Sequence, residues 1–309
     1  MSKREIINVV VHGGLFHVDD AMAYAMLRRV AAIEGFELKL TRVRKGDRAA
    51  CEAADIRLDV GGRNNPGNGD IDHHQEGGAG RRWWNGIPYA TAGLILRQFG
   101  ELICGGKAEA RIVENSLIQQ IDAEDNGFSL YVKTLEFTHP VTVSQIFKAM
   151  NPNSNEEQDY DAAFWQGVEM ADKMLDRFIA HARAIVHCKE PVFAAMAVAE
   201  ASDPRIIVFD ADLSKDGVGT IMGRSAAALY MVYPDNEEGI WRVKCVPRGA
   251  KSFFEQRKPL PADWAGKKDS QLAEASGVPD ATFCHPKRFT AGAVSKEGAL
   301  ALAKLAADA

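Results

Sequence analysis

Cysteine is scarce in this sequence, and its spacing matches neither a zinc knuckle nor a disulfide framework. The five cysteines are scattered singly, with no C-x-x-C pair among them. Isolated cysteines of this kind are typical of a protein kept in a reducing compartment. We therefore expect a cytoplasmic protein whose core needs no covalent cross-links. The cysteines are Cys51, Cys104, Cys188, Cys245 and Cys284.

Long hydrophobic runs are also missing. No run approaches the roughly 18 apolar residues that a membrane-spanning helix needs. Residues 1–5 lead directly into a short apolar stretch, without the features of a signal or transit peptide. Internal repeats and low-complexity tracts are not found. We expect no membrane association.

Positive charge is not in excess. The chain carries 37 Lys and Arg against 42 Asp and Glu, a net charge of -5. This balance argues against a broad basic face that coats duplex nucleic acid, but it does not exclude a local basic groove. A chain of 309 residues is longer than the usual single core, which predicts roughly two domains.

The first residues whose side chains could bind a metal follow a predicted strand. Residues 6–11 form a β-branched run closed by His12 and two glycines, and residues 21–32 favour a helix with acids at its start. In an open α/β sheet, ligands gather at the carboxyl ends of the strands. One of the two acids, Asp19 or Asp20, could equally be the N-cap of this helix instead of a ligand. This position holds His12, His17, Asp19 and Asp20.

A second group follows residues 54–62, another predicted strand. Asp59 stands at its end, and the next loop delivers Asp72, His73 and His74. Neutral imidazole with carboxylate suits Mn, Fe, Co and Zn, and a ligating imidazole needs a partner behind it. Taken alone, the histidine pair also fits a solvated surface turn. Because the ends of parallel strands converge, we expect both groups to meet.

Further acids stand where the predicted helix at residues 108–121 ends. An acid at a helix C-terminus opposes the macrodipole by about 0.3–1 kcal/mol, which a metal ion would offset. An Asp-Asn-Gly turn explains Asp125 well and Asp122 less well, so the choice between them stays open.

In the remaining chain, the apolar spacing predicts a long amphipathic helix over residues 161–187. The pattern changes from helix-like to strand-like after it, which predicts a domain boundary near residues 187–191. Apolar runs at residues 192–198, 205–209, 227–233 and 241–246 then predict strands, followed by helices at 270–276 and 295–307. We predict an α/β protein with a metal-binding catalytic domain at 1–187, built on a mainly parallel sheet flanked by helices. A smaller α/β domain for substrate is predicted at 188–309.

Together these groups supply ligands for two metal ions bridged by one carboxylate. Two ions about 3.5–4 Å apart hold a bridging hydroxide and clamp an in-line displacement at phosphorus. The pattern therefore predicts a phosphoester hydrolase.

The order His-x4-His-x-Asp, then Asp, then Asp-His-His, then Asp resembles the DHH phosphoesterase superfamily, which includes RecJ-type exonucleases, oligoribonucleases and manganese pyrophosphatases. It is most similar to one branch, the melanocyte-proliferating-gene family, labelled metal-dependent protein hydrolases and described as exonuclease-like toward RNA. The resemblance covers nearly the whole chain. It is carried by residues 12–21, 59–62, 71–75, 92–95, 121–127, 151–152, 241–247, 257–264 and 283–300.

The resemblance implies a role for each motif residue. One metal would be held by His12, His17 and Asp59, and the other by Asp19, Asp59, His73 and either Asp122 or Asp125. His74 would face the substrate phosphate, with Asp72 orienting the histidine pair. The wider superfamily has an acid where His17 stands, and the extra imidazole favours Mn or Zn over Mg.

The second domain would contact the substrate. The superfamily's glycine-rich segment has its nearest counterpart around His285, Lys287 and Arg288, without the triple glycine, and Arg248 and Arg257 are further candidates for phosphate. Solvated surface charge explains Lys287 and Arg288 equally well. The run from Arg81 to Trp84 could stack a base and contact phosphate, or its tryptophans could be packing anchors.

We therefore expect a Mn-dependent phosphodiesterase, exonuclease-like with 3′–5′ polarity, acting on short single-stranded RNA or DNA, although the residues do not fix the direction. The alternatives are a phosphatase or pyrophosphatase for a small nucleotide and a non-catalytic metal- or nucleotide-binding protein. A metal peptidase is disfavoured because no His-Glu-x-x-His motif is present. Self-association into a homo-oligomer is left open.

Overall fold

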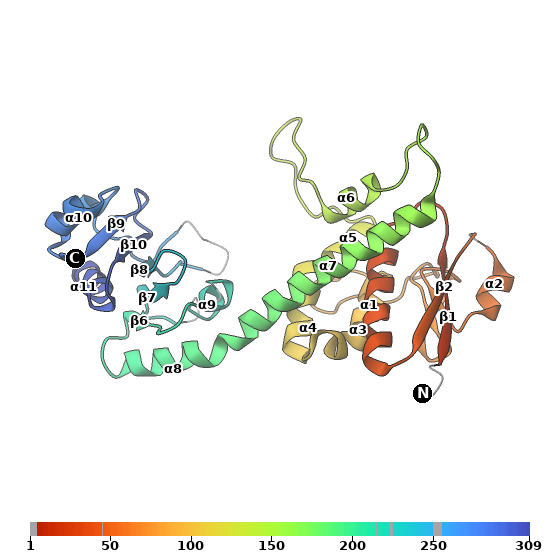
Figure 1. The fold of residues 1–309 in the computed structure, drawn as a ribbon, viewed down its shortest axis with the longest axis horizontal. Helices are drawn as coiled ribbons and strands as arrows, with labels where there is room; N and C mark the ends of the chain where they lie inside the picture. Colours follow the sequence, from red (N-terminus) through yellow and green to blue (C-terminus); the bar gives the residue numbers. More distant parts are fainter. Residues whose placement is uncertain (1–4, 45, 214, 223–224, 250–254) are drawn as a thin grey trace. The chain divides into compact units, whose positions relative to one another are not determined.

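The chain folds into two compact units, Met1–Ala182 and Arg183–Ala309, seen in the computed structural model of Figure 1. The structure describes residues 5–44, 46–213, 215–222, 225–249 and 255–309. The division falls inside the long helix α7 (Tyr160–His187), near the boundary that the sequence predicts at 187. The prediction that residues 1–5 lack a signal or transit peptide falls on residues 1–4, which lie outside the described residues.

The first unit is built on a five-stranded sheet in the order β2-β1-β3-β5-β4. β1 pairs in parallel with both β2 and β3, β3 pairs in parallel with β5, and only the edge strand β4 is antiparallel. The predicted mainly parallel sheet is therefore confirmed. Its strands are β1 (Ile6–His12), β2 (Glu37–Val43), β3 (Ile56–Leu58), β4 (Asn64–Asn65) and β5 (Asp70–Ile71).

Helices cover both faces of this sheet. Val9 and Val11 of β1 pack into the main core with α1, α3 and α7, whereas Val10 points to the other face, toward α2. Burial on both faces explains why β1 is a continuous β-branched run. The helices are α1 (Val18–Glu34), α2 (Arg48–Ala53), α3 (Thr91–Cys104), α4 (Lys107–Val113), α5 (Gln119–Asp125), α6 (Val143–Ala149) and α7, with a 3-10 turn at Pro66–Asn68 and a π-helical turn at Glu114–Ile118.

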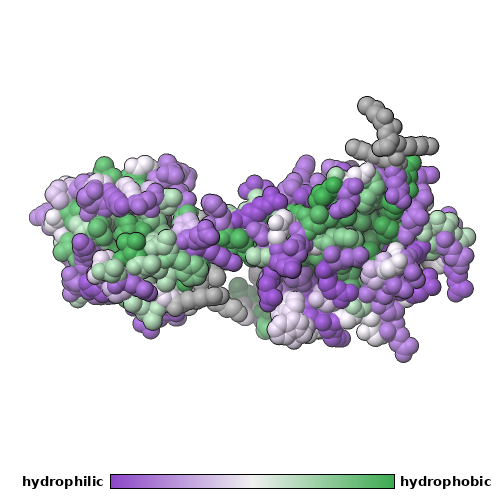
Figure 2. Space-filling view, turned by 90° about the horizontal axis from the view of Figure 1, so that it is seen from below, coloured by the Kyte–Doolittle hydropathy of each residue, from purple (hydrophilic) through white to green (hydrophobic). Residues whose placement is uncertain are grey.

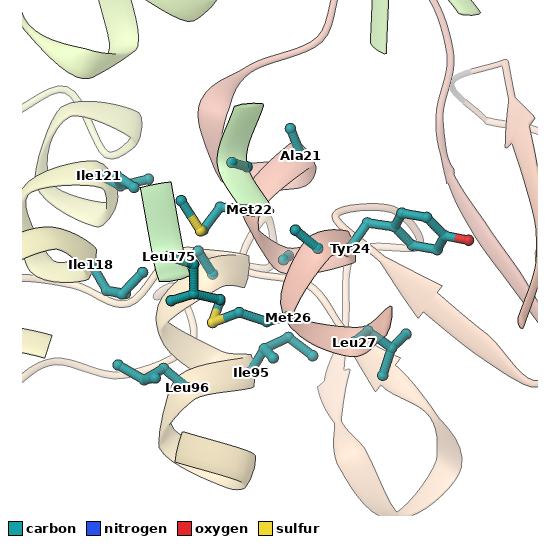
Figure 3. Packing of buried hydrophobic residues seen from close by; sticks show 14 of the residues in the cluster. Ala21, Met22, Tyr24, Met26, Leu27, Ile95, Leu96, Ile118, Ile121 and Leu175 are labelled. Carbon is teal, nitrogen blue, oxygen red and sulfur yellow. The ribbon is translucent and has the colours of Figure 1, made fainter. Parts of the chain in front are cut away.

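Helix α1 lies at the centre of the main core. Its residues from Val18 to Leu27 are all buried, as expected of a helix enclosed on every side. Figure 3 shows Met22 and Met26 pointing toward residues of α3, α5 and α7, while Tyr24 and Leu27 point the other way. This packing fixes the N-terminus of α1, where Asp19 and Asp20 stand.

The second unit has its own five-stranded sheet, in the order β6-β7-β8-β10-β9. β6 pairs in parallel with β7 and the other pairs are antiparallel, so the smaller unit is also α/β, as predicted. Its elements are α8 (Lys189–Glu200), β6 (Ile206–Val208), α9 (Lys215–Met222), β7 (Tyr230–Asp235), β8 (Ile240–Cys245), a 3-10 turn (Ala262–Trp264), α10 (Asp269–Ser276), β9 (Ala281–Cys284), β10 (Thr290–Ala293) and α11 (Lys296–Asp308).

The predicted strand at residues 192–198 is wrong, because these residues belong to α8. Val192 and Ala199 are fully or nearly buried and Ala195 and Met196 partly so, which is the spacing of one helix face. Alanine and methionine also favour helix over strand. The apolar run was too uniform to reveal its period.

Hydrophilic residues cover much of the face shown in Figure 2, with hydrophobic residues exposed between them in both units. Among the residues that the structure describes, no helix combines the length and apolar character needed to cross a membrane.

Candidate metal centre

Asp59 is the central residue of the site. It follows β3 with a φ of 52°, a left-handed conformation that costs free energy for a residue with a side chain and that clusters at functional sites. The residue is 4% exposed, and its carboxylate accepts a hydrogen bond from Thr91 Oγ1 (3.2 Å). The strained backbone therefore directs a buried carboxylate toward the start of α3.

One group of donor atoms gathers at one oxygen of Asp59. His12, at the end of β1, places Nε2 3.3 Å from Asp59 Oδ2 and 2.9 Å from Asp20 Oδ2. Asp20 is fully buried; its other oxygen accepts a hydrogen bond from the His17 backbone (2.9 Å) and so caps α1. One carboxylate thus serves both as a cap and as a donor.

A second group lies at the other oxygen of Asp59. His73 Nε2 is 3.3 Å from Asp59 Oδ1 and 3.0 Å from Asp125 Oδ2. Asp19, His73 and Asp125 bring one donor atom each to within 4.8 Å of one another. Both oxygens of Asp19 also accept backbone N–H groups of α3, from Thr91 (3.0 Å) and Ala92 (2.7 Å).

Asp72 holds the histidine pair in place. Its Oδ2 accepts the backbone N–H of Gly62 (2.6 Å), and Oδ1 accepts those of His73 (2.7 Å) and His74 (3.1 Å). Asp72 Oδ1 also lies 2.8 Å from His74 Nδ1. The His74 side chain is 53% exposed, and it also lies near Asp59 and His73.

The structure brings Asp125, and not Asp122, to these groups. Asp122 is fully buried, and both its oxygens are occupied, Oδ1 by the backbone N–H of Gly93 (3.0 Å) and Oδ2 by Arg82 Nη2 (2.7 Å). The Arg82 guanidinium is the cation beside this acid, although burial still raises the pKa of Asp122 to about 7. Asp122 instead supports the start of α3.

His17 lies at the rim of the centre. Its side chain is 61% exposed, its Nδ1 is 3.8 Å from Asp125 Oδ1, and its ring is 5.8 Å from that of His12. Asp20 stands beside His12 where the resemblance implied His17. The loop before α1 is fixed by Asn151, which accepts the Phe16 N–H and donates to the Phe16 carbonyl, both at 2.9 Å.

Crowded carboxylates perturb the pKa values of the centre. Burial raises the pKa of Asp19 well above its usual range, and the charges of Asp125 and Asp59 raise it further. Burial would lower the pKa of His12, but hydrogen bonds to Asp20 and Asp59 outweigh it and raise the pKa to about 10. For His73, bonds to Asp125 and Asp59 outweigh burial and raise the pKa to about 11.

The opposite shift is found at Asp59. Burial would raise its pKa, yet hydrogen bonds from His12 and His73 hold the pKa well below the usual range. The centre therefore offsets its buried negative charge by holding protons on its histidines.

The donor set fits divalent ions. Imidazole nitrogens and carboxylate oxygens suit Mn, Fe, Co and Zn. Among the described residues, the buried atoms Asp20 Oδ2 and His73 Nε2 have charged neighbours only within the centre, His12 at 2.9 Å and Asp125 at 3.0 Å, and these contacts fall short of regular hydrogen-bond geometry. Buried polar atoms normally have well-formed partners, and a bound cation would supply one to each of these atoms. Asp59 offers one oxygen to each of the two donor groups.

Five of the predicted substrate residues, Arg248, Arg257, His285, Lys287 and Arg288, lie in the second unit. Arg257 donates to the carbonyl of Ala228 (3.0 Å), and Arg288 donates to that of Leu260 (3.2 Å). His285 accepts the backbone N–H of Lys287 (3.1 Å), and exposed Arg248 donates to the Gln256 carbonyl (3.3 Å). These bonds shape loops of that unit, and contact with substrate stays a prediction.

Sequence reasoning did not assign a role at the centre to Arg82, Glu114, Thr91, Gly93 or Asn151. Asp20 was noticed but not assigned as a ligand. A Cβ at Gly93 would lie 1.8 Å from Asp122 Oδ2, so only glycine allows this approach. For Asp20, the signal available in the sequence was the pair of adjacent acids at the start of α1, because one oxygen of a carboxylate can cap the helix while the other serves as a donor.

Comparison with known proteins supports one family. Residues 8–307 match the model of the MYG1 exonuclease family, described as an uncharacterised protein family (UPF0160). A MYG1 protein of Schizosaccharomyces pombe is 30% identical over 332 residues, covering 98% of both chains. The MYG1 exonuclease of Rattus norvegicus is 29% identical, covering 95% of this chain and 82% of the relative.

Among solved structures, RecJ from Thermus thermophilus in complex with Mn²⁺ matches 98% of this chain and 52% of its own, at 14% identity. Its TM-score of 0.27 is too low to support an inference. The family match spans nearly the whole sequence and includes every residue of the candidate centre. The chain therefore belongs to the MYG1 exonuclease family.

Proposed function

We propose that this protein is a metal-dependent phosphodiesterase that removes nucleotides from short single-stranded RNA or DNA. The observation that carries the proposal is the position of Asp59, whose two oxygens face two different donor groups, 3.3 Å from His12 on one side and 3.3 Å from His73 on the other. A carboxylate shared in this way is the feature of a two-ion site for phosphoryl chemistry.

Divalent ions bound there would neutralise the phosphate charge and activate a water molecule. The chain's residues set where this happens. His12 and Asp20 provide the donors on one side of Asp59, and His73, Asp19 and Asp125 provide them on the other. The imidazoles favour Mn over Mg.

In this proposal His74 contacts the substrate phosphate. Its hydrogen bond to Asp72 is the main cause that raises its pKa, so the ring keeps a proton more readily. With 53% of the side chain exposed, the ring can donate from its outer nitrogen to a phosphate oxygen. Asp72 keeps the ring oriented through its own three backbone hydrogen bonds.

Relatives support the choice of substrate class. Family members from Rattus norvegicus and Homo sapiens are named exonucleases. The net charge of -5 favours a short strand over a long duplex, because duplex binding relies on many cationic contacts.

The test is hydrolysis of a short 5′-labelled RNA, the matching DNA, a dinucleotide and pyrophosphate, each with Mn²⁺, Mg²⁺, Zn²⁺ or EDTA. Wild type is compared with His73→Ala, and His187→Ala serves as the matched control because His187 is exposed at the end of α7. We expect a Mn²⁺-dependent product ladder that His73→Ala abolishes and His187→Ala preserves.

Other outcomes lead to other functions. Cleavage of only the dinucleotide or pyrophosphate would indicate a small-nucleotide hydrolase. If metal binds in near-stoichiometric amount while no phosphoester is cut, the proposed activity is wrong and a binding protein takes its place.

A further inference from the structure

Two adjacent tryptophans are displayed on a hairpin of the first unit. The hairpin spans residues 80–89, closed by backbone hydrogen bonds from Arg82 to Ile87 (2.9 Å) and from Tyr89 to Gly80 (3.0 Å). Trp83 is 85% exposed and Trp84 is 37% exposed. Their rings lie 5.8 Å apart at 83°. The alternative that these tryptophans are packing anchors is therefore wrong for Trp83.

The hairpin is fixed in a way that keeps Trp83 outside. Arg82, the neighbouring residue, is fully buried, pairs with Glu114 and Asp122, and donates to the Pro88 carbonyl (3.0 Å). Its guanidinium also lies 4.3 Å from the centre of the Tyr89 ring. Since Arg82 points inward, a rearrangement that buried Trp83 would break this network. A rigid display of this kind lowers the entropic cost of binding.

Positive charges stand beside the exposed rings. Arg111 lies with its guanidinium 5.5 Å from the centre of the Trp84 ring. Arg81, on the hairpin itself, is exposed and donates to the Gly86 carbonyl (3.1 Å). Aromatic faces next to arginines are the surface that single-stranded nucleic acid requires, because bases stack on the rings while cations contact the phosphates.

The hairpin is joined to the metal centre by one side chain. Arg82 Nη2 donates to Asp122 (2.7 Å), and Asp122 stands one helical turn before Asp125, a donor of the candidate centre. Asp122 also accepts the N–H of Gly93, in the turn of α3 that holds Asp19. The hairpin that carries the tryptophans and the helix that carries Asp125 are therefore held by the same buried network.

We propose that Trp83 and Trp84 form a stacking platform for an unpaired base of a single-stranded RNA or DNA, with Arg81 and Arg111 contacting its phosphates. The platform binds a nucleotide beyond the one being cleaved. It selects single strands because a base inside a duplex is already stacked between its neighbours and has no free face. The inference rests on the proposed function for its substrate class.

The first measurement is binding, made with EDTA so that no metal-dependent cleavage takes place. Fluorescence anisotropy with a labelled single-stranded hexanucleotide compares wild type, Trp83→Ala and Trp83→Phe. Loss of one stacked base should weaken binding roughly 5- to 150-fold, and the phenylalanine variant should retain most of the affinity. Phe193→Ala is the matched control, because Phe193 is an exposed aromatic (56%) of the second unit.

The second measurement is hydrolysis with Mn²⁺ of the hexanucleotide and of an abasic strand of the same length, a diester without a base or any other aromatic ring. Trp83→Ala should raise KM for the hexanucleotide and leave hydrolysis of the base-free diester unchanged. Circular dichroism shows whether the variants remain folded.

The outcomes separate this inference from the proposed function. If the diester is cut while Trp83→Ala binds the hexanucleotide like wild type, the platform is refuted and the phosphodiesterase stands. If Trp83→Ala weakens binding while no phosphoester is cut, the platform stands and the phosphodiesterase fails. An equal loss of affinity for the matching duplex also refutes the platform, because stacking requires a free base.

Discussion

Filling the metal centre near neutral pH should release about two protons per protein molecule. An imidazole binds a metal only in its neutral form, so a protonated ligand must first lose its proton. Without metal, the pKa of His12 is raised to about 10 and that of His73 to about 11. Both rings are therefore protonated at physiological pH, and both must give up a proton.

The same protons set the pH dependence of affinity. Below both pKa values, each released proton makes the apparent affinity rise about tenfold per pH unit, or about 1.4 kcal/mol. Two protons predict a rise of about 100-fold per unit. Asp19 adds to the count where its raised pKa leaves it protonated.

Isothermal titration calorimetry with Mn²⁺ measures both quantities. EDTA-stripped protein is titrated at about pH 7 and about pH 8, in two buffers whose ionisation enthalpies differ, and the difference in heat gives the protons released. His12→Asn should release one proton fewer, whereas the exposed control His187→Ala should match wild type. A proton count near zero, or an affinity independent of pH, would show that the two histidines are not metal ligands.

Three further changes test the centre and its support. Folding raises the pKa values of His12 and His73 above 6.5. Their contribution to the stability of the metal-free protein is therefore complete below about pH 6.5 and is lost as the pH rises toward 10. Urea unfolding in EDTA should show this loss of stability, and Mn²⁺ should reverse it. Asp125→Asn should lower the Mn²⁺ stoichiometry with little change in stability. Asp122→Asn should keep metal binding but lower the free energy of unfolding in urea by about 2 kcal/mol, because the substitution weakens a hydrogen bond from a charged arginine. Loss of metal from Asp122→Asn alone would contradict the assignment. Gly93→Ala should lower the free energy of unfolding by about 3 kcal/mol or more, because its Cβ would lie 1.8 Å from the Asp122 carboxylate. Gly219→Ala has open space around its Cβ and should raise the free energy of unfolding by up to about 1 kcal/mol. Equal thermal shifts for the two variants would refute this packing.

The sequence predicted those parts of the centre that strands position. A β-branched run followed by His12, and an acid placed before glycines at Asp59, both mark a strand end, and parallel strands bring their ends together. Asp-His-His is local in sequence, so its mutual contacts also follow from spacing. The main sheet and the presence of two α/β parts follow from the same apolar periodicity.

The choice between Asp122 and Asp125 could not be made in this way. Both acids lie within one turn of α5, so periodicity places them on nearly the same face. The decision depends on Arg82, 40 residues earlier in the chain, whose buried guanidinium pairs with one acid and leaves the other for the centre. Long-range pairing of this kind leaves no local pattern in a single sequence. Arg82 itself appeared only as part of a basic and aromatic run.

The start of α3 explains why the helix-borne acids are placed as they are. Its first N–H groups have no partner inside the helix, and three of them are taken by carboxylates, Thr91 and Ala92 by Asp19 and Gly93 by Asp122. The positive end of the helix favours these charges and fixes the direction of the Asp19 oxygens. Asp19 can then face His73 and Asp125 without a hydrogen bond from either. Changes at residues 91–93 should therefore alter metal affinity even though none of these residues offers a donor to the metal.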